Sequence, residues 1–229
     1  MSDIYLDGDP PVQVTLRRSA RARRLSLRVS RLDGRVTLSM PKRLPEREAV
    51  AFLREKEDWV RKHLGNRPED RHPEFGARIP VLGREVEICP GTGRRAVLRD
   101  GRLEVPGAED RVPARIKAFL KLEAGLRLRA ATDRYAAALG VSYGRLSLRD
   151  PRSRWGSCTS EGNLMYSWRL MMAPEAVLDY VAAHEVAHRL EMNHSERFWA
   201  HVARICPDHA GHRRWLHAEG ETLHAWRFE

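Results

Sequence analysis

Two histidines that stand four residues apart, His184 and His188, enclose Glu185 in the sequence HEVAH. On an α-helix, side chains at positions i and i+4 lie one above the other, with their Cβ atoms about 6 Å apart. Two imidazoles at that separation can reach one metal ion at about 2.0–2.1 Å from each nitrogen. Glu185 lies about 100° around the helix from His184, so its carboxylate reaches the space beside the ion, where a water would bind. The pattern therefore predicts two metal ligands and a general base.

A third protein ligand has to complete such a site. His194 is the candidate, because continuing the helix would carry a ligand too far along its axis and the chain therefore has to turn. Glu191 is the rival, but it would stay on the helix and recede from the ion. We expect Asn193 to end the helix in the left-handed conformation and Ser195 to cap the next one. The expected site holds one Zn²⁺ on three imidazoles and keeps an open fourth position for water, which predicts a zinc-dependent hydrolase.

Residues 1–108 predict a mostly β region with one helix. Apolar and polar side chains alternate through the first 40 residues, which indicates antiparallel strands, and Asp33-Gly34 suits a hairpin turn between two of them. A helix is expected over residues 45–65, since Pro45 fits its first turn and Gly65 its end. Short strand patterns return, separated by glycine turns, over residues 84–88, 96–99 and 102–105.

Residues 109–229 predict a second region, in which helices dominate. A long helix over residues 110–139 is expected to bury a face that includes Leu126. The last strand pattern of the chain, residues 163–170, can form an edge strand that offers its backbone to an extended peptide. The helix that carries HEVAH is expected to begin near Pro174. The order of elements predicts an α+β fold, with a boundary near residue 108 and no internal repeat visible in the sequence.

The net charge of +10 is concentrated near the N-terminus. The densest basic run consists of Arg17, Arg18, Arg21, Arg23, Arg24, Arg28, Arg31 and Arg35. Such a run favours a nucleic acid, a nucleotide or an acidic protein surface as partner, or it forms the solvated face of a strand. No stretch of about 18 apolar residues exists, so no membrane span is expected. Three widely spaced cysteines without a C-x-x-C motif, and an N-terminus unlike a signal peptide, favour a cytoplasmic protein.

Two segments resemble the YgjP-like metallopeptidases, a bacterial and archaeal family of the zincin class. Residues 152–199 contain the blocks RWGSC, WRL before AP, YVAAHEVAH and NHSERFW where that family would have them, and residues 17–41 resemble it more weakly. The resemblance implies a minimal zincin fold for residues 109–229, related to the SprT-like proteases, and a peptide or protein substrate. It also implies zinc on His184, His188 and His194, with Glu185 catalytic.

The residues themselves leave the substrate open. The same activated water can attack a peptide bond or a phosphoanhydride, so a metal-dependent nucleoside triphosphate pyrophosphatase or phosphohydrolase is the alternative to a metallopeptidase. A nucleic-acid-associated protease of the SprT-like kind is a third hypothesis. Arg154 can stabilise an oxyanion or a phosphate, or pair with a core acid. Tyr166 can orient water or substrate, or belong to the core. Gly156 permits a tight bend that would bring its strand near the helix.

Overall fold

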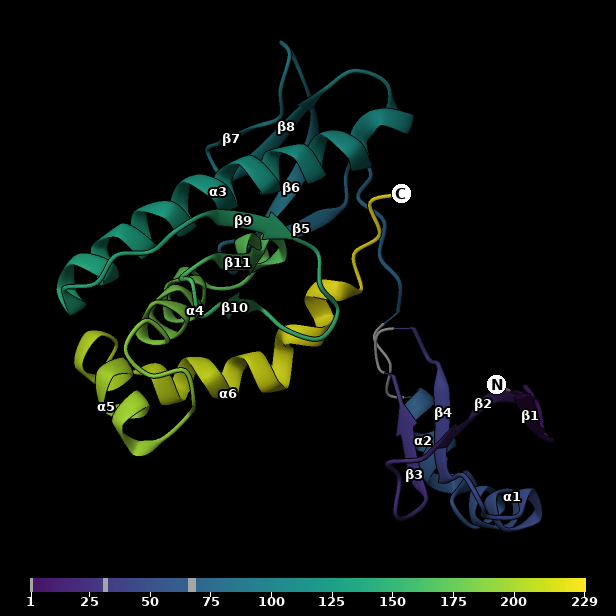
Figure 1. Ribbon diagram of the computed structural model, residues 1–229. Coiled ribbons are helices and arrows are strands. Elements are labelled where there is room, and N and C mark those ends of the chain that lie inside the picture. The colour runs from purple at the N-terminus through teal and green to yellow at the C-terminus, as the bar shows by residue number, and fades with distance from the viewer. Residues whose placement is uncertain (1, 31–32, 66–68) are drawn as a thin grey trace. The chain divides into compact units, whose positions relative to one another are not determined.

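The computed structural model describes residues 2–30, 33–65 and 69–229 and shows the α+β fold that the sequence predicts (Figure 1). The chain divides into two compact units, Met1–Glu69 and Asp70–Glu229, each with its own hydrophobic core. The predicted boundary near residue 108 differs from this division, because the strands of residues 78–106 share one core with the long helix that follows them. Within the described ranges, no helix is both long enough and apolar enough to cross a membrane.

The first unit is a four-stranded sheet with two helices. Its strands, in the order β1-β2-β4-β3, are β1 (Ser2–Leu6), β2 (Val12–Ser19), β3 (Ser26–Val29) and β4 (Val36–Pro41). The outer pairs are antiparallel as predicted, but β2 and β4 run parallel, so the prediction of antiparallel strands throughout is wrong there. The predicted helix over residues 45–65 is interrupted at Lys56 and forms α1 (Glu46–Glu55) and α2 (Glu57–Gly65). Arg31 of the basic run lies outside the described residues.

The second unit begins with a sheet of the same topology. Its strands, in the order β5-β6-β8-β7, are β5 (Arg78–Val81), β6 (Arg84–Gly91), β7 (Val97–Arg99) and β8 (Arg102–Pro106). Again the central pair is parallel and the outer pairs are antiparallel. The arrangement of β1–β4 therefore recurs, although the sequence shows no repeat. A strand needs only alternating apolar residues to bury one face, and this pattern leaves the residue identities free to differ.

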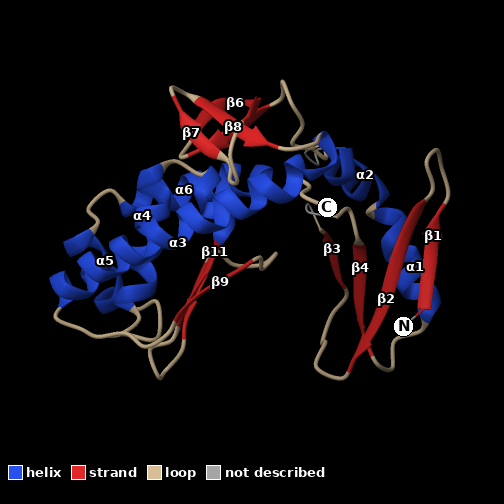
Figure 2. Cartoon of the chain, turned by 90° about the horizontal axis from the view of Figure 1, so that it is seen from above, coloured by secondary structure: helices blue, strands red, loops and turns tan. Residues whose placement is uncertain are grey.

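The long helix α3 (Val112–Leu139) lies between that sheet and a third, smaller one (Figure 2). It follows a short 3₁₀ turn, η1 (Glu109–Arg111), and ends at Gly140, whose φ of 67° places it in the left-handed region. Predicted core positions such as Ile116 are fully buried, but Leu126 is 60% exposed, so its predicted burial is wrong. The helix also packs against residues 168–172 and 175–187, and it leaves Leu122 and Leu126 exposed to solvent.

The third sheet contains β9 (Leu146–Arg149), β10 (Gly156–Cys158) and β11 (Leu164–Ser167) in the order β10-β11-β9. The prediction that residues 163–170 form an edge strand is wrong, because β11 pairs with β10 on one side and with β9 on the other. The edge strands of this sheet are β10 and β9 instead. After β11 the chain turns into η2 (Trp168–Met172), which ends the strand earlier than predicted.

Helices complete the second unit. They are α4 (Glu175–Ala187), α5 (Glu196–Ile205), α6 (His209–Glu219) and the 3₁₀ turn η3 (Gly220–His224). The buried Arg169 of η2 ties the C-terminal residues to this unit. Its guanidinium donates to both carboxylate oxygens of Asp150, at 2.7 and 3.2 Å, and to the carbonyl oxygens of Leu223 and Trp226, at 2.8 and 3.0 Å.

Candidate metal centre

Helix α4 carries two of the three predicted ligands at its C-terminal end. His184 lies in its last turn, and His188 is the residue that directly follows the helix. The helix therefore ends well before Asn193, and among the described residues other than glycine only Leu82 and Asp100 have positive φ. The prediction for Asn193 is wrong in this respect. Its side chain instead accepts a hydrogen bond from the backbone N–H of Ser195, at 3.0 Å, within the turn towards α5.

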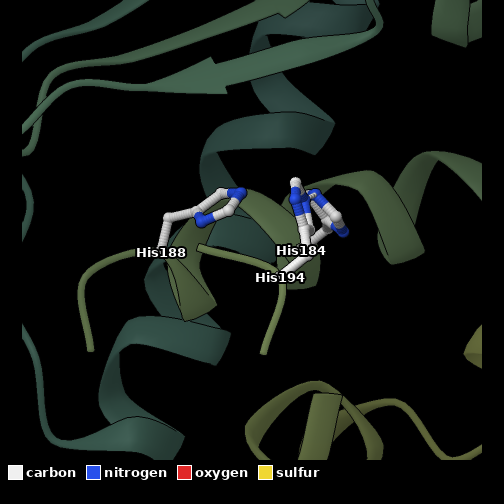
Figure 3. Close-up of side chains that lie close together, drawn as sticks. All are labelled: His184, His188 and His194. Atoms are coloured by element: carbon white, nitrogen blue, oxygen red, sulfur yellow. Dashed lines mark hydrogen bonds between the residues drawn. The ribbon is translucent and has the colours of Figure 1, made fainter. Parts of the chain in front are cut away.

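The turn brings His194 back to the end of α4. The side chain of Ser195 accepts a hydrogen bond from the N–H of Phe198 and caps α5, as the sequence predicts. Figure 3 shows the imidazoles of His184, His188 and His194 gathered in one place. One ring nitrogen from each lies within 4.8 Å of the others, and the Nε2 atoms of His184 and His194 are 3.1 Å apart. Two zinc–nitrogen bonds at a tetrahedral angle would separate their nitrogens by about 3.3 Å, so His184 and His194 have the spacing of two zinc ligands, and the three side chains together can hold a metal ion.

The other contacts of these rings hold them in place. Nδ1 of His188 donates to the carbonyl oxygen of Glu191 at 3.0 Å, which leaves its Nε2 for an ion. Two aromatic side chains of α5 pack against the rings: Phe198 stacks on His188, with centroids 4.5 Å apart, and Trp199 stacks on His194, at 5.9 Å. The carboxylate of the rival ligand Glu191 pairs with Arg197 at 3.0 Å.

Burial sets the charge states of the residues at this site. It lowers the pKa of His184 to about 3, with further contributions from His188, His194 and Arg213, and it also lowers the pKa of His188. Neutral imidazole is the form that binds metals, so these shifts favour a metal site. Burial likewise raises the pKa of Glu185 to about 8, against the charge of Arg154. A divalent cation nearby would oppose this rise, because it stabilises the carboxylate.

Glu185 is 5% exposed and lies against the edge strand β10. At Gly156 in that strand, an added Cβ would be 2.5 Å from Oε1 of Glu185, so the absence of a side chain at this position lets the strand approach the acid closely. Oε2 of Glu185 and Nδ1 of His184 are buried without a hydrogen-bond partner among the described residues. An orphaned carboxylate oxygen of this kind is suited to receive a proton from a bound water.

Two cavities meet at His184 and Glu185. One contains all three histidines together with the backbone edge of β10, and has a volume of about 430 Å³. The other, of about 270 Å³, lies towards α6. Arg154 lines both cavities, which places the predicted substrate-binding arginine beside the site, next to the buried Glu185.

Tyr166 is placed differently. It is fully buried on β11, and its hydroxyl shares a hydrogen bond of 3.1 Å with the hydroxyl of Thr132 on α3. It lines neither cavity, so its position gives no support to the prediction that it binds substrate. Sequence reasoning also missed Arg213, which lines the smaller cavity from α6. Its position next to Arg214 in a basic helix gave no signal that one of the two faces the site.

Comparison with known protein families decides between the hypotheses. The model of the YgjP-like metallopeptidase domain matches residues 23–219. The chain belongs to the YgjP-like family. Membership implies a metal ion and a peptide or protein substrate for this YgjP-like chain, and the cluster of His184, His188 and His194 is where the structure can hold an ion. The family gives no support to the predicted nucleotide or nucleic-acid partners.

Two further comparisons concern individual proteins. No curated protein matches this YgjP-like chain. Among solved structures, it is similar to the metallopeptidase zymogen abylysin of Pyrococcus abyssi, with a TM-score of 0.36 and 18% sequence identity. That similarity covers 40% of this chain and 93% of the abylysin chain.

Proposed function

We propose that this chain is a zinc-dependent metallopeptidase whose catalytic site lies in residues 109–229. The observation that carries the proposal is the convergence of three imidazole nitrogens within 4.8 Å of one another, beside the buried carboxylate of Glu185. Three neutral nitrogen ligands suit zinc and leave a fourth position free. In a zinc site that only stabilises the fold, a fourth protein ligand would fill that position. The cavity of the three histidines instead contains Glu185, which can act as a base.

Glu185 is the general base of the proposed reaction. When bound, zinc polarises the scissile carbonyl and lowers the pKa of a water to about 7. The free Oε2 of Glu185 accepts the proton of the attacking water, and the same carboxyl group then donates it to the leaving amine. His184, His188 and His194 hold the ion. The contacts from Glu191 and from α5 keep the imidazoles of His188 and His194 oriented.

The edge strand β10 supplies a place for the substrate backbone. Gly156, Ser157 and Cys158 line the cavity of the three histidines, and the side of β10 that faces away from β11 has no strand partner among the described residues. An extended peptide can add to such an edge by backbone hydrogen bonds. This arrangement would hold a peptide bond next to Glu185, which Gly156 contacts directly.

The proposal is tested by assaying the purified full-length protein against unstructured polypeptides. We expect cleavage of the polypeptides with zinc, loss of cleavage after chelation, and recovery when zinc is added back. Nucleoside triphosphates serve as the comparison substrate in the same buffer. Zinc-dependent release of phosphate or pyrophosphate without any peptide cleavage would contradict a peptidase and favour the alternative hydrolase.

A further inference from the structure

The smaller cavity beside Glu185 differs in character from the cavity of the three histidines. Trp155, Tyr180, Val181 and Leu216 give it apolar walls, while Arg154 and Arg213 add two positive charges. Its volume of about 270 Å³ lies at the lower end of ligand pockets, which run from about 300 to 1,000 Å³. A space of this size holds one side chain or a chain end rather than a folded partner.

The two arginines reach this cavity from different segments of the chain. Arg154 lies two residues before the edge strand β10, and Arg213 belongs to α6. Neither forms an ion pair with an acidic side chain in the part of the chain that the structure describes, although Arg213 lies over the ring of Trp199 at 4.9 Å. Both line a cavity that His184 and Glu185 also line, so their charges lie beside the site itself.

Two guanidinium groups at one apolar pocket favour a planar anion. Guanidinium donates pairs of parallel hydrogen bonds to a carboxylate, and apolar walls strengthen such bonds by excluding water. Among the residues that the structure describes, Glu185 is the only acidic one that lines this cavity, and the proposed reaction uses it as a base. An anion that neutralises both arginines therefore has to come from the substrate.

We propose that this cavity binds a carboxylate of the peptide substrate, held between Arg154 and Arg213 next to the bond to be cleaved. This inference rests on the proposed peptidase function and adds a specificity to it. The carboxylate belongs either to an acidic side chain or to the C-terminus of the substrate. The net charge of +10 acts in the same direction, because it attracts acidic peptides over a longer range.

The test compares matched peptides that differ in one charge. In the first series, each pair consists of a peptide with Glu at one position and the same peptide with Gln there, and every position is tested in turn. In a further pair, the same peptide carries either a free C-terminal carboxylate or a C-terminal amide. We expect kcat/KM to fall by about fivefold in one of these pairs, the effect typical of a partly exposed ion pair. The pair that responds identifies the source of the carboxylate.

The protein variants assign the effect to the cavity. R213M is expected to abolish the preference, whereas R214M removes the same charge from the next position of α6, which lines neither cavity at the site, and is expected to keep it. R213E is expected to reverse the preference in favour of a Lys-containing peptide. Equal kcat/KM values for both members of every pair, unchanged in R213M, would overturn the proposal while leaving the peptidase function intact.

A binding measurement separates this proposal from the proposed function. Fluorescently labelled peptides of the same pairs are titrated into zinc-loaded E185Q protein, with and without R213M. Suppose that the E185Q protein binds the carboxylate-bearing peptide of a pair more tightly, that this preference is lost with R213M, and that the wild type cleaves no peptide. This result would support the carboxylate site and reject the proposed peptidase function. Peptide cleavage by the wild type without any such preference in affinity or kcat/KM would do the opposite.

Discussion

Gly156 and Glu185 are so close that no other residue fits at position 156 without displacing the acid. An added Cβ would lie 2.5 Å from Oε1, 2.6 Å from Cγ and 2.7 Å from Cδ of Glu185. Glu185 is buried on α4, and Gly156 pairs with Tyr166 in the neighbouring strand. Both sides of the contact are therefore held by packed elements, and the glycine sets the position of the proposed base.

The substitution G156A is expected to reduce peptide cleavage by about 100-fold, because a displacement of about 1 Å at a reacting group can cost that much. Zinc content is expected to stay the same, since the three atoms nearest to this Cβ all belong to Glu185 and none to a histidine. The matched control is G211A in α6, where an added Cβ meets only the end of the Arg214 side chain, at 3.9 Å. Full activity of G156A would show that this contact does not position Glu185.

Local sequence patterns predicted the part of the site that a single helix and the following turn form. The spacing of His184 and His188 fixes their relation on α4, and Ser195 caps α5 as expected. The chain leaves the helix earlier than predicted, at His188, yet His194 still reaches the ion site. The position of His194 therefore depends more on the direction of the turn after α4 than on the residue at which α4 ends.

The remaining features depend on contacts between distant segments. Arg213 enters the site only because α6 packs against α4, and no local pattern distinguishes it from Arg214. Burial on α3 was misjudged at Leu126 because the segments that cover this helix, chiefly α4 and η2, leave that side chain open to solvent, and periodicity does not show which part of an apolar stripe they cover. Similarly, β11 is a central strand because it pairs in parallel with β9, a pairing that sequence periodicity does not reveal.

Metal binding is expected to depend on His194 and not on the carboxylate of Glu191. H194A removes one of three ligands and should weaken zinc affinity by more than about 100-fold, since loss of a residue that merely orients a ligand already costs up to about 100-fold. E191Q is the control, because the carbonyl that accepts the hydrogen bond of His188 is retained. Competition with a chromogenic chelator measures both affinities. Equal zinc affinity of H194A and the wild type would exclude His194 as a ligand.

The buried Arg169 is expected to be the largest single contributor among the ion pairs to the stability of the second unit. R169A leaves Asp150 and two carbonyl oxygens without their donor and should lower the free energy of unfolding by about 3 kcal/mol or more. R99A is the comparison, since Arg99 and Glu104 form an exposed pair at 3.9 Å worth at most about 1 kcal/mol. Urea unfolding measures both. Similar losses in the two variants would contradict this assignment.

His224 is expected to make the protein less stable in mild acid. Burial and the nearby Arg169 lower its pKa from 6.5 to about 4, so the unfolded chain binds a proton at this residue more readily than the folded one. Stability from this group is present above pH 6.5 and is lost as the pH falls towards 4, by at most about 3 kcal/mol.

The variant H224F keeps an aromatic ring against Trp155, on which His224 now packs with centroids 5.0 Å apart. Urea unfolding of both proteins at pH 7 and pH 5, at one zinc concentration, isolates the contribution of this residue because the other titrating groups are shared. We expect a smaller loss of stability in H224F. Parallel losses in the two proteins would show that His224 does not titrate in this way.

The central claim, that Glu185 acts as a base beside an ion held by three histidines, is tested most directly by E185Q. Zinc content and peptide cleavage are measured on the same samples of wild type and variant. We predict about one zinc ion per chain in both, and a loss of kcat of at least about 100-fold in E185Q, the lower range for removal of a general base. A zinc-loaded E185Q protein that cleaves peptides at the wild-type rate would contradict the account.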